Sequence, residues 1–505
     1  MVTEILFSLL LGLVIIFYFY ITQNNDYWKK RGVPFEKPVF LFGNYLESLL
    51  GRKHFGMIQA DLYNKFKTAR YVGYFKLTSP VIVLRDPELI KNVLVKDFYS
   101  FINNEFQVDP IVDPIQATNP FTKKDEEWKT SRGQWSASLT TSKVKAMYEV
   151  MWGKGNVMVE HIESVIKDNP NQRWEAREMA ANFFTDVIVS AVFGLEVNSW
   201  TSTDNQFRKI TRSIFLATFW DGLINLSFVV APWMSKVFNL RFVSKSVAAR
   251  LTAIAQEIIT CRNETSLLKN DVYEIMKKYS ELDSKHAITV TELAGRVFGF
   301  LVDGTETSSG VLGLVLFELA AHPEIQNKLR VELDAAAPKG EMIPFDDLTR
   351  LPYLDMVFSE TTRMYSPLLS INRICGKEYE FPAALSGGQP IRIPVGMTVT
   401  IPTFALHRDP QYFPDPEKFD PERFSPEAKN KITKFTYMPF GEGPRICIGM
   451  KLAHAQMKVA VAHIIRNFDV KFCPDGQKKP ILPDPNVFIF RAIDKLLITI
   501  HKRTS

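Results

Sequence analysis

The first apolar stretch of the chain is long enough to cross a membrane. Residues 5–21 carry no charge, and only Ser8 and Gly12 interrupt a run of large apolar and aromatic residues. A hydrocarbon core of roughly 30 Å needs about 20 helical residues, within a range of about 17 to 25. A cleaved signal peptide fits less well, because Glu4 replaces the basic start and no A-x-A-like site follows. We therefore expect a retained membrane anchor over residues 1–22.

Basic residues directly after this stretch predict its orientation. Lys29, Lys30 and Arg31 follow the apolar run, and the positive-inside rule places such residues in the cytosol. Prolines break any continuing helix, so we expect residues 23–40 to form a basic, proline-containing hinge. The sequence shows no later linker, which predicts that residues 41–505 form one domain on the cytosolic side.

The hydrophobic spacing of the remaining chain is mostly helical. Residues 50–330 largely follow a period of 3.6. Residues 72–87 are an exception, because their β-branched and aromatic runs predict strands. Residues 448–467 return to a helical pattern, and residues 469–505 alternate like closing strands. The pattern predicts a mainly α fold with a small β portion.

One predicted helix exceeds thirty residues and should lie in the interior. Thr289 and Glu292 form a capping box at its start, and Pro323 closes it. Residues 293–319 are apolar nearly all round, which is typical of a buried helix. Each glycine within it costs roughly 1 kcal/mol relative to alanine. We therefore expect a flat ligand and crossing helices to lie close against glycines 295, 299, 304, 310 and 313.

Residues 213–243 are unusually apolar and have two interpretations. Trp220 and Trp233 lie among scattered polar groups in this segment. The segment forms either a pair of core helices or a surface loop that dips into the same membrane as the anchor. The sequence leaves both open.

Composition excludes several classes of protein. Hydrophobic residues make up 46% and charged residues 23%, and 61 basic against 55 acidic residues give a net charge of +6. These values exclude disordered, collagen-like and nucleic-acid-tail compositions, and no nucleic-acid partner is expected. The four cysteines are too scattered for a disulfide framework, which favours a reducing compartment.

Residues 440–449 carry the most informative motif of the chain. The sequence FGEGPRICIG places the thiol of Cys447 in a glycine-containing turn just before a helix. Glycines let a flat ligand approach the main chain closely. A helix N-terminus and nearby amides favour a thiolate over a thiol. These features predict a metal ligand rather than a buried spectator cysteine.

This decapeptide resembles the haem-binding signature of the cytochromes P450, Phe-x-x-Gly-x-Arg-x-Cys-x-Gly, at all five fixed positions. The resemblance implies an α-rich single domain with a small β portion. It also implies that Cys447 is the proximal thiolate ligand of haem b iron and that Arg445 neutralises a haem propionate. The other residues of this decapeptide that we expect at the haem site are Phe440, Gly443 and Gly449, which are fixed positions of the signature, and Gly441.

Two further motifs resemble the family's structural clamp. Glu360 and Arg363 match its E-x-x-R, whose two ends share one helix face and can form a bidentate ion pair. Arg423 lies in a match to P-E-R-F, within residues 407–427, where five prolines in 21 residues predict a compact irregular loop. The resemblance implies that all three side chains hold this loop beneath the haem.

Three more residues resemble the family's propionate-binding set. Trp128 and Arg132 match W-x-x-x-R, with both side chains on one helix face, and Arg373 follows the E-x-x-R motif where a further arginine is common. A dianionic cofactor in a low-dielectric site needs such compensation, because unpaired buried charge is costly.

The segment from Gly304 to Ser308 resembles the family's distal acid and alcohol motif. The resemblance implies that Thr307 hydrogen-bonds the bound dioxygen and that Glu306 belongs to the solvent chain that delivers protons. Asp303 departs from the family, in which most members carry alanine. It shares a helix face with Thr307.

The Asp303 carboxylate has several possible roles. It would enter the distal pocket, where it would attract a basic substrate or assist proton delivery, or it would pair with an arginine away from the haem. We favour the pocket.

The resemblance covers essentially the whole chain and is closest to the microsomal class, particularly insect enzymes. It implies a monooxygenase of the endoplasmic reticulum membrane that inserts one atom of O2 into a lipophilic xenobiotic, hormone or lipid. The sequence has no nicotinamide or flavin fingerprint. Electrons should therefore come from NADPH through NADPH–cytochrome P450 reductase, with cytochrome b5 as a further partner and Lys434 and Lys451 as candidate contacts.

Two alternative functions remain open from the sequence. An isomerase or dehydratase of the same fold needs no reductase, but the intact Glu306–Thr307 pair argues against it. A catalytically silent haem or ligand carrier at the membrane is the other. By analogy, substrate contacts would come from residues 101–121, 368–371 and 487–489 and from Phe298, Phe300 and Leu301.

Overall fold

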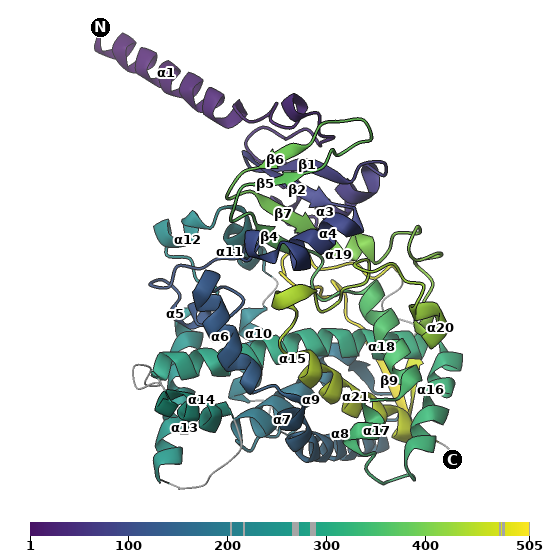
Figure 1. Cartoon of the computed structure of the whole chain (residues 1–505). Helices are drawn as coiled ribbons and strands as arrows, with labels where there is room; N and C mark the ends of the chain where they lie inside the picture. Colours follow the sequence, from purple (N-terminus) through teal and green to yellow (C-terminus); the bar gives the residue numbers. More distant parts are fainter. Residues whose placement is uncertain are drawn as a thin grey trace.

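The structure is a computed structural model that describes the whole chain except residues 202–204, 216–217, 265–271, 283–288, 474–475, 477–479 and 504–505. Helices dominate it (Figure 1), as the hydrophobic pattern predicts. The helices in the first half of the chain are α1 (Val2–Thr22), α2 (Leu46–Leu49), α3 (Phe55–Lys65), α4 (Pro87–Lys91), α5 (Pro114–Ala117), α6 (Asp125–Ala137), α7 (Thr141–Ala146), α8 (Tyr148–Asp168), α9 (Ala176–Val187), α10 (Gln206–Ile214), α11 (Phe219–Val230) and α12 (Trp233–Val237).

The second half continues with α13 (Lys245–Glu264), α14 (Val272–Leu282), α15 (Val290–Ala321), α16 (Pro323–Ala336), α17 (Phe345–Leu348), α18 (Pro352–Met364), α19 (Thr403–Leu406), α20 (Pro426–Lys429) and α21 (Met450–Asn467).

Helix α15 runs through the middle of the molecule, and helices from both halves of the chain lie against it (Figure 1). The capping box of Thr289 and Glu292 starts it, and Pro323 begins the next helix. Most side chains from Leu293 to Ala320 are buried. The predicted interior helix is confirmed.

The glycines of α15 make room for other parts of the protein. A Cβ added at Gly295 would overlap Oγ1 of Thr118, and one added at Gly299 would overlap the ring of Trp135. Gly310 has only an ordinary contact. The crossing segments around α5 and α6 therefore account for the first two positions without a bound ligand.

The strands form three small sheets. The largest has the order β1-β2-β7-β4, and β1 and β2 form an antiparallel hairpin where residues 72–87 predict strands. This sheet lies at the end of the molecule from which α1 emerges (Figure 1). The strands are β1 (Tyr71–Lys76), β2 (Ser79–Leu84), β3 (Arg173–Glu175), β4 (Ile371–Ile374), β5 (Tyr379–Phe381), β6 (Ile391–Ile393), β7 (Thr398–Ile401), β8 (Phe468–Phe472) and β9 (Leu497–Lys502).

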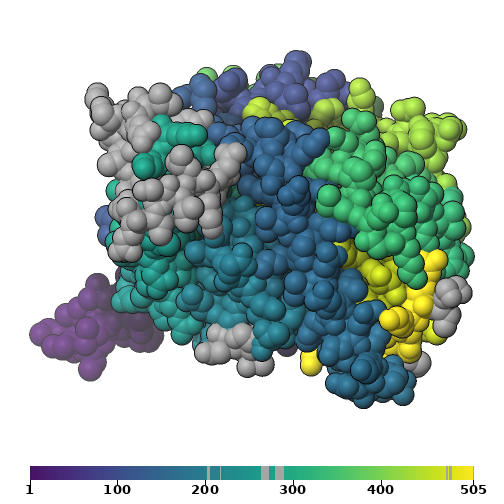
Figure 2. Space-filling view, turned by 90° about the horizontal axis from the view of Figure 1, so that it is seen from below, coloured from purple at the N-terminus to yellow at the C-terminus, as the bar shows by residue number. Residues whose placement is uncertain are grey.

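Helix α1 projects away from the body of the molecule (Figures 1 and 2) and has no buried residue. Among the described residues, α1 and α15 are the two single helices long and apolar enough to span a membrane, but α15 is the core helix just described. Only α1 therefore offers its apolar surface outward along its whole length.

The segment predicted as a hinge is attached to the domain near its start. The Trp28 side chain is fully buried, its indole lies where a side chain at Gly73 would be, and its Nε1–H donates to the Tyr74 carbonyl at 3.2 Å. The chain leaving the anchor is thus fixed against β1, and any hinge is confined to the residues before Trp28.

Helices α11 and α12 share features of both interpretations of residues 213–243. Phe228 and Val229 are buried, whereas Trp220 is 72% exposed and Trp233 is 63% exposed. The inner side of the segment is core, and its outer side presents large apolar residues to the surroundings.

Candidate active site

Cys447 lies between a 3₁₀ turn over Gly443–Arg445 and the start of α21. Its backbone N–H donates to the carbonyl of Phe440 at 2.8 Å, which closes the turn. The side chain is solvent-accessible and forms no disulfide, although the helix that follows is mostly buried. The fold therefore keeps this sulfur open to a ligand.

Opposing influences act on the pKa of Cys447. The surrounding protein desolvates the sulfur although part of it is accessible, which raises the pKa of this thiol. The backbone amides of Gly449 and Met450 and the Arg132 charge oppose that rise only in part. Helix-terminal amides act in the predicted direction but are outweighed by desolvation. A bound cation such as iron would supply the missing stabilisation.

The glycines of the turn serve different purposes. Gly441 and Gly443 both have φ of 75°, a region that favours glycine. At Gly443 a Cβ would overlap the backbone carbonyl of Leu94, whereas at Gly441 it would lie 3.7 Å from Cδ1 of Ile371. Gly449 has an ordinary φ and open space around it. The close approach at Gly443 is thus made by the protein's own backbone, and not by a flat ligand.

Arg132, Arg373 and Arg445 come together from three distant parts of the chain. The Arg132 Nη2 donates to the Ile446 carbonyl at 2.6 Å, and the Arg445 Nη2 donates to the Lys123 carbonyl at 2.9 Å. Burial, together with the charges of Arg373 and Arg132, lowers the pKa of Arg445 to about 9. The guanidinium groups therefore lie near enough to repel one another.

No carboxylate forms an ion pair with these three arginines in the part of the chain that the structure describes. Burial lowers the pKa of Arg373 to about 10, and its Nε has no hydrogen-bond partner. Such a cluster is costly unless an anion compensates it. A dianionic group beside Cys447 fits this set, and the two haem propionates are such a group.

Trp128 supports this cluster from α6. Its side chain is buried, and the Arg445 guanidinium lies 4.3 Å from the centre of its ring. A cation over an indole face is favourable. Phe440 makes a different contact, with its ring 5.0 Å from that of His454.

Glu360, Arg363 and Arg423 meet at the C-terminal end of α18. Arg363 and Glu360 form a fully buried ion pair, with Nε and Oε2 2.7 Å apart, and the Arg423 Nε lies 3.4 Å from Glu360 Oε1. Arg363 also donates to the carbonyls of His407 and Pro416, both at 2.8 Å. The pair therefore attaches the proline-rich loop to α18 through its backbone.

Asp303 and Thr307 share one face of α15, as their spacing predicts. The Thr307 hydroxyl donates to the Asp303 backbone carbonyl at 2.6 Å. The Asp303 carboxylate accepts a hydrogen bond from Asn119 Nδ2 at 2.9 Å. Its charge contributes to the raised pKa of Cys447, so the Asp303 carboxylate lies near the cysteine turn.

Glu306 points elsewhere and contacts arginines instead of solvent. It is 1% exposed, and its carboxylate pairs with Arg177 Nη2 and with Arg208 Nη1, the latter at 3.3 Å. Glu178 also pairs with Arg208, at 2.8 Å. Any movement of protons through Glu306 therefore has to include this network.

Asn119, Arg177 and Arg208 were not foreseen from the sequence. Each lies far along the chain from its acidic partner and carries no motif. An unpaired interior carboxylate at position 303 or 306 is the one signal that some partner had to exist, but it does not identify that partner.

The segments expected to contact substrate are partly brought together. The Phe488 ring lies 5.4 Å from that of Phe106 and 6.4 Å from that of Phe121, which joins two of the predicted segments. Phe300 instead stacks on Trp135, with ring centres 5.0 Å apart. It lies in the core between α6 and α15.

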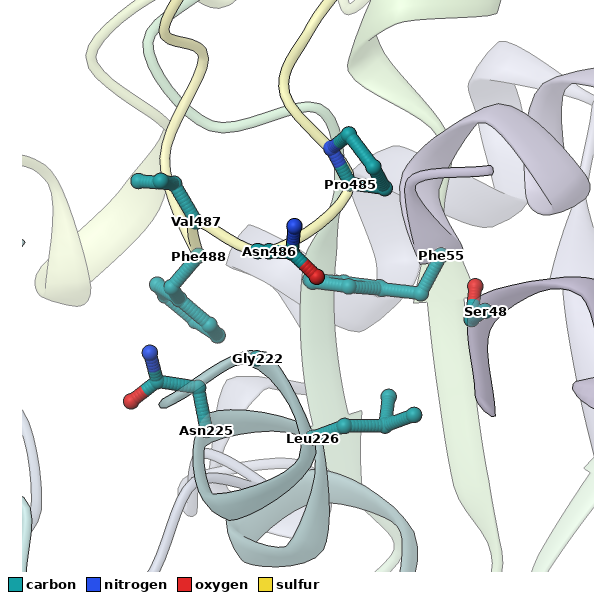
Figure 3. Close-up of a pocket in the computed structure, with 9 residues that line it drawn as sticks. All are labelled: Ser48, Phe55, Gly222, Asn225, Leu226, Pro485, Asn486, Val487 and Phe488. Carbon is teal, nitrogen blue, oxygen red and sulfur yellow. The ribbon is translucent and has the colours of Figure 1, made fainter. Parts of the chain in front are cut away.

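A small pocket opens beside the joined segments (Figure 3). Its lining combines the loop after Pro485 with α11 and the ends of α2 and α3. Figure 3 shows the Phe488 and Phe55 rings above α11, with Leu226 facing them. The lining residues are Ser48, Phe55, Gly222, Asn225, Leu226, Pro485, Asn486, Val487 and Phe488.

Comparisons with known proteins agree with this geometry. The family model described as "Cytochrome P450" matches residues 33–498. Cytochrome P450 6j1 of Blattella germanica is 33% identical over 487 residues, which cover 96% of this chain and 95% of the relative. Lithocholate 6-beta-hydroxylase of Mesocricetus auratus is 33% identical over 498 residues, 95% of each chain. Probable cytochrome P450 6d4 of Drosophila melanogaster is 30% identical over 490 residues, 92% of this chain and 93% of the relative.

The cysteine turn, the arginine cluster and the whole-length match lead to one conclusion. The chain belongs to the cytochrome P450 family and is a haem-thiolate monooxygenase.

Proposed function

We propose that this monooxygenase inserts one oxygen atom of O2 into a lipophilic xenobiotic, hormone or lipid, with electrons from NADPH delivered by NADPH–cytochrome P450 reductase. The observation that carries the proposal is the position of Cys447. Its sulfur is accessible, the Asp303 charge on α15 acts on it, and three nearby arginines form no ion pair with a carboxylate among the described residues.

Four side chains would hold the cofactor. Cys447 would bind the iron, and Arg132, Arg373 and Arg445 would neutralise the propionates. When bound, the haem supplies the iron at which O2 is activated. Trp128 keeps Arg445 in place through its ring, and the buried pair of Glu360 and Arg363 keeps the loop before Cys447 folded.

On the distal side, Thr307 would supply a hydrogen bond and a proton to the reacting oxygen. For that the hydroxyl has to leave the Asp303 carbonyl, which it now contacts at 2.6 Å. Glu306 is one residue away, but both of its oxygens are held by Arg177 and Arg208. We propose that Glu306 relays protons only after one of these contacts opens.

The electron donor would dock on the side of the cysteine turn. Lys434 and Lys451 are exposed there, and Lys451 Nζ donates to Thr141 Oγ1 at 2.8 Å. Exposed lysines attract an acidic partner over a distance that salt limits. Cytochrome b5 would use the same side.

The enzyme would be held at the endoplasmic reticulum membrane by α1, with the domain in the cytosol. The basic turn over Lys29–Arg31 follows the anchor directly. The exposed apolar side of α11 and α12 supports a second membrane contact.

The test is spectroscopic. The full-length protein, expressed with haem, reduced and exposed to carbon monoxide, should show the red-shifted Soret band of a thiolate-bound haem. Cys447→Ser should lose that band, whereas Cys261→Ser, a change at another exposed cysteine, should keep it. Retention of the band in the Cys447 variant would refute the assignment. Turnover that needs both NADPH and reductase would exclude an isomerase, a dehydratase or a silent carrier.

A further inference from the structure

Asp303 is an accessible carboxylate on an otherwise buried helix. Its neighbours Val302 and Thr305 are buried, while Asp303 itself is exposed. It lies on the same face of α15 as Thr307, whose hydroxyl donates to the Asp303 backbone carbonyl at 2.6 Å. The carboxylate therefore faces the space in which a substrate of the proposed monooxygenase would lie.

A neutral amide, and no cation, holds this carboxylate. Asn119 Nδ2 donates to Asp303 Oδ2 at 2.9 Å, and Asn119 Oδ1 accepts the backbone N–H of Phe121 at 2.9 Å. The second bond fixes which end of the amide faces Asp303. No lysine, arginine or histidine pairs with Asp303 among the described residues, and Asn119 is the only partner that influences its pKa besides burial.

The surrounding protein desolvates the Asp303 carboxylate although part of it is accessible, so a counter-ion would stabilise its charge. Burial raises the pKa of Asp303 to about 6, so at pH 7 the ionised form still prevails by about ten to one. Charge without a partner in such surroundings is costly, and a cation brought by the substrate would remove that cost. The cluster of Arg132, Arg373 and Arg445 does not provide this counter-ion, because its groups lie on the side of the cysteine turn.

Aromatic rings cluster close to Asn119, the residue that holds Asp303. Phe121 follows Asn119 by two residues, and its ring lies 5.9 Å from that of Phe106 and 6.4 Å from that of Phe488. Aromatic faces bind the alkyl and aryl parts of a ligand and also attract an ammonium group. The surroundings thus combine one fixed negative charge with apolar surface.

We propose that Asp303, positioned by Asn119, is a specificity residue that binds the cationic nitrogen of a lipophilic amine. This inference rests on the proposed function and names the substrate class that the site prefers. Asp303 is neither a metal ligand nor a proton donor in this role. Asn119 is a positioning residue, because its hydrogen bonds set the direction of the carboxylate.

The test compares two ligands of equal shape. One is a trimethylammonium ion that carries a phenylbutyl chain, and the other is its neutral tert-butyl isostere. Neither has a lone pair that could coordinate iron. Binding to the full-length holoenzyme is measured by calorimetry and by the substrate-induced Soret shift, without turnover. The wild type should bind the cation more tightly than the isostere.

Three variants complete the experiment. Asp303→Asn should weaken binding of the cation by about tenfold or more and change binding of the isostere by less than about twofold. Asp303→Glu should retain the preference for the cation. This variant still tests the inference if Asp303→Asn folds poorly. Asp494→Asn, a change at an exposed carboxylate far along the chain, should have no effect.

Equal affinity of the wild type for both ligands, or a cation preference that survives Asp303→Asn, would overturn the inference. Because the carbon monoxide spectrum is recorded on the same samples, these outcomes are distinguishable from failure of the proposed function. A protein with the thiolate band and no cation preference would refute only the role of Asp303.

Discussion

Arg363 donates two hydrogen bonds to Glu360, from Nε to Oε2 at 2.7 Å and from Nη2 to Oε1 at 2.8 Å, and neither side chain is exposed. Removing one partner of a buried pair leaves the other charge without compensation, at a cost of about 3 to 5 kcal/mol. Glu360→Gln and Arg363→Leu should therefore lower the free energy of unfolding by that amount and reduce the yield of haem-loaded protein.

Arg423→Gln is the matched comparison for this pair. The Arg423 side chain is 14% exposed, its closest contact with Glu360 is 3.4 Å, and Arg363 still compensates the carboxylate in its absence. The loss should be clearly smaller than for Arg363→Leu. Urea unfolding of the three variants measures the difference, and equal losses would show that Arg423 is an equal member of the clamp.

Gly443 and Gly441 have the same φ but different neighbours, which allows a direct comparison. Alanine at either position adopts a left-handed conformation at a cost of roughly 1 to 2 kcal/mol. At Gly443 the new methyl group would also overlap the Leu94 carbonyl, whereas at Gly441 it has an ordinary contact. Gly443→Ala should lose haem binding and Gly441→Ala should keep most of it, as haem absorbance relative to protein absorbance measures. The reverse order would be inconsistent with this geometry.

How much of this site is predictable from the sequence depends on the kind of contact. Cys447 and the pair of Glu360 and Arg363 lie within short motifs, because the Cys447 turn closes on Phe440 and the pair shares one helix face. Arg445 lies in the same motif as Cys447, but its partners come from distant segments. The capping box at Thr289 and the interior position of α15 follow from local spacing in the same way.

Contacts between distant segments cannot be predicted from short motifs. Nothing local indicates that Asn119 contacts Asp303 or that Arg208 contacts Glu306, because these pairs are set by how α5 and α10 cross α15. The motif also does not indicate the raised pKa of Cys447. It shows the backbone amides that lower this pKa but not the desolvation that outweighs them. Local chemistry is readable from the sequence, whereas its balance with burial requires the fold.

We expect the protein to lose stability in mild acid because of His407. Burial, with the charges of Arg363 and Arg408, lowers the pKa of His407 to about 3, and its Nε2 accepts the backbone N–H of Met438 at 2.9 Å. The folded protein keeps this ring neutral, but an unfolded chain binds a proton below about pH 6.5. Stability is therefore fully present above that pH and falls as the pH drops from about 6.5 toward about 3, by about 1.4 kcal/mol per pH unit for this one group.

Urea midpoints between pH 7.5 and pH 5 check this expectation. The His407→Gln variant should be less stable than the wild type at pH 7.5 but should show a shallower decline with falling pH. His54 contributes a similar slope, because burial lowers its pKa to about 4, so the decline should not disappear. An unchanged slope in the variant would mean that His407 does not titrate between the two states.

We expect removal of the Glu306 charge to lower both the stability of the protein and the delivery of protons. Glu306→Gln removes the negative charge that two buried guanidinium groups of Arg177 and Arg208 share. We expect a loss of about 3 kcal/mol or more in unfolding free energy and a lower fraction of consumed NADPH that appears in product. Glu178→Gln is the control, because its carboxylate belongs to the same network but is 35% exposed. Because Glu178 does not contact Glu306 itself, this change should reduce stability less and lower that fraction less than Glu306→Gln does.

We expect the protein to contact the membrane through Trp220 and Trp233 even after α1 is removed. Both lie on the outer side of α11 and α12 and are more than half exposed, as is typical of rings that insert at a bilayer surface. A variant without residues 1–22 should still co-sediment with phosphatidylcholine vesicles, and the further changes Trp220→Ser and Trp233→Ser should release it. Val331→Ser, which removes a 70% exposed apolar residue on α16, should leave binding unchanged, since that helix lies at the far side of the molecule from α1 (Figure 1). Complete release on removal of α1 alone would instead show that the outer side of α11 and α12 makes no independent contact with lipid.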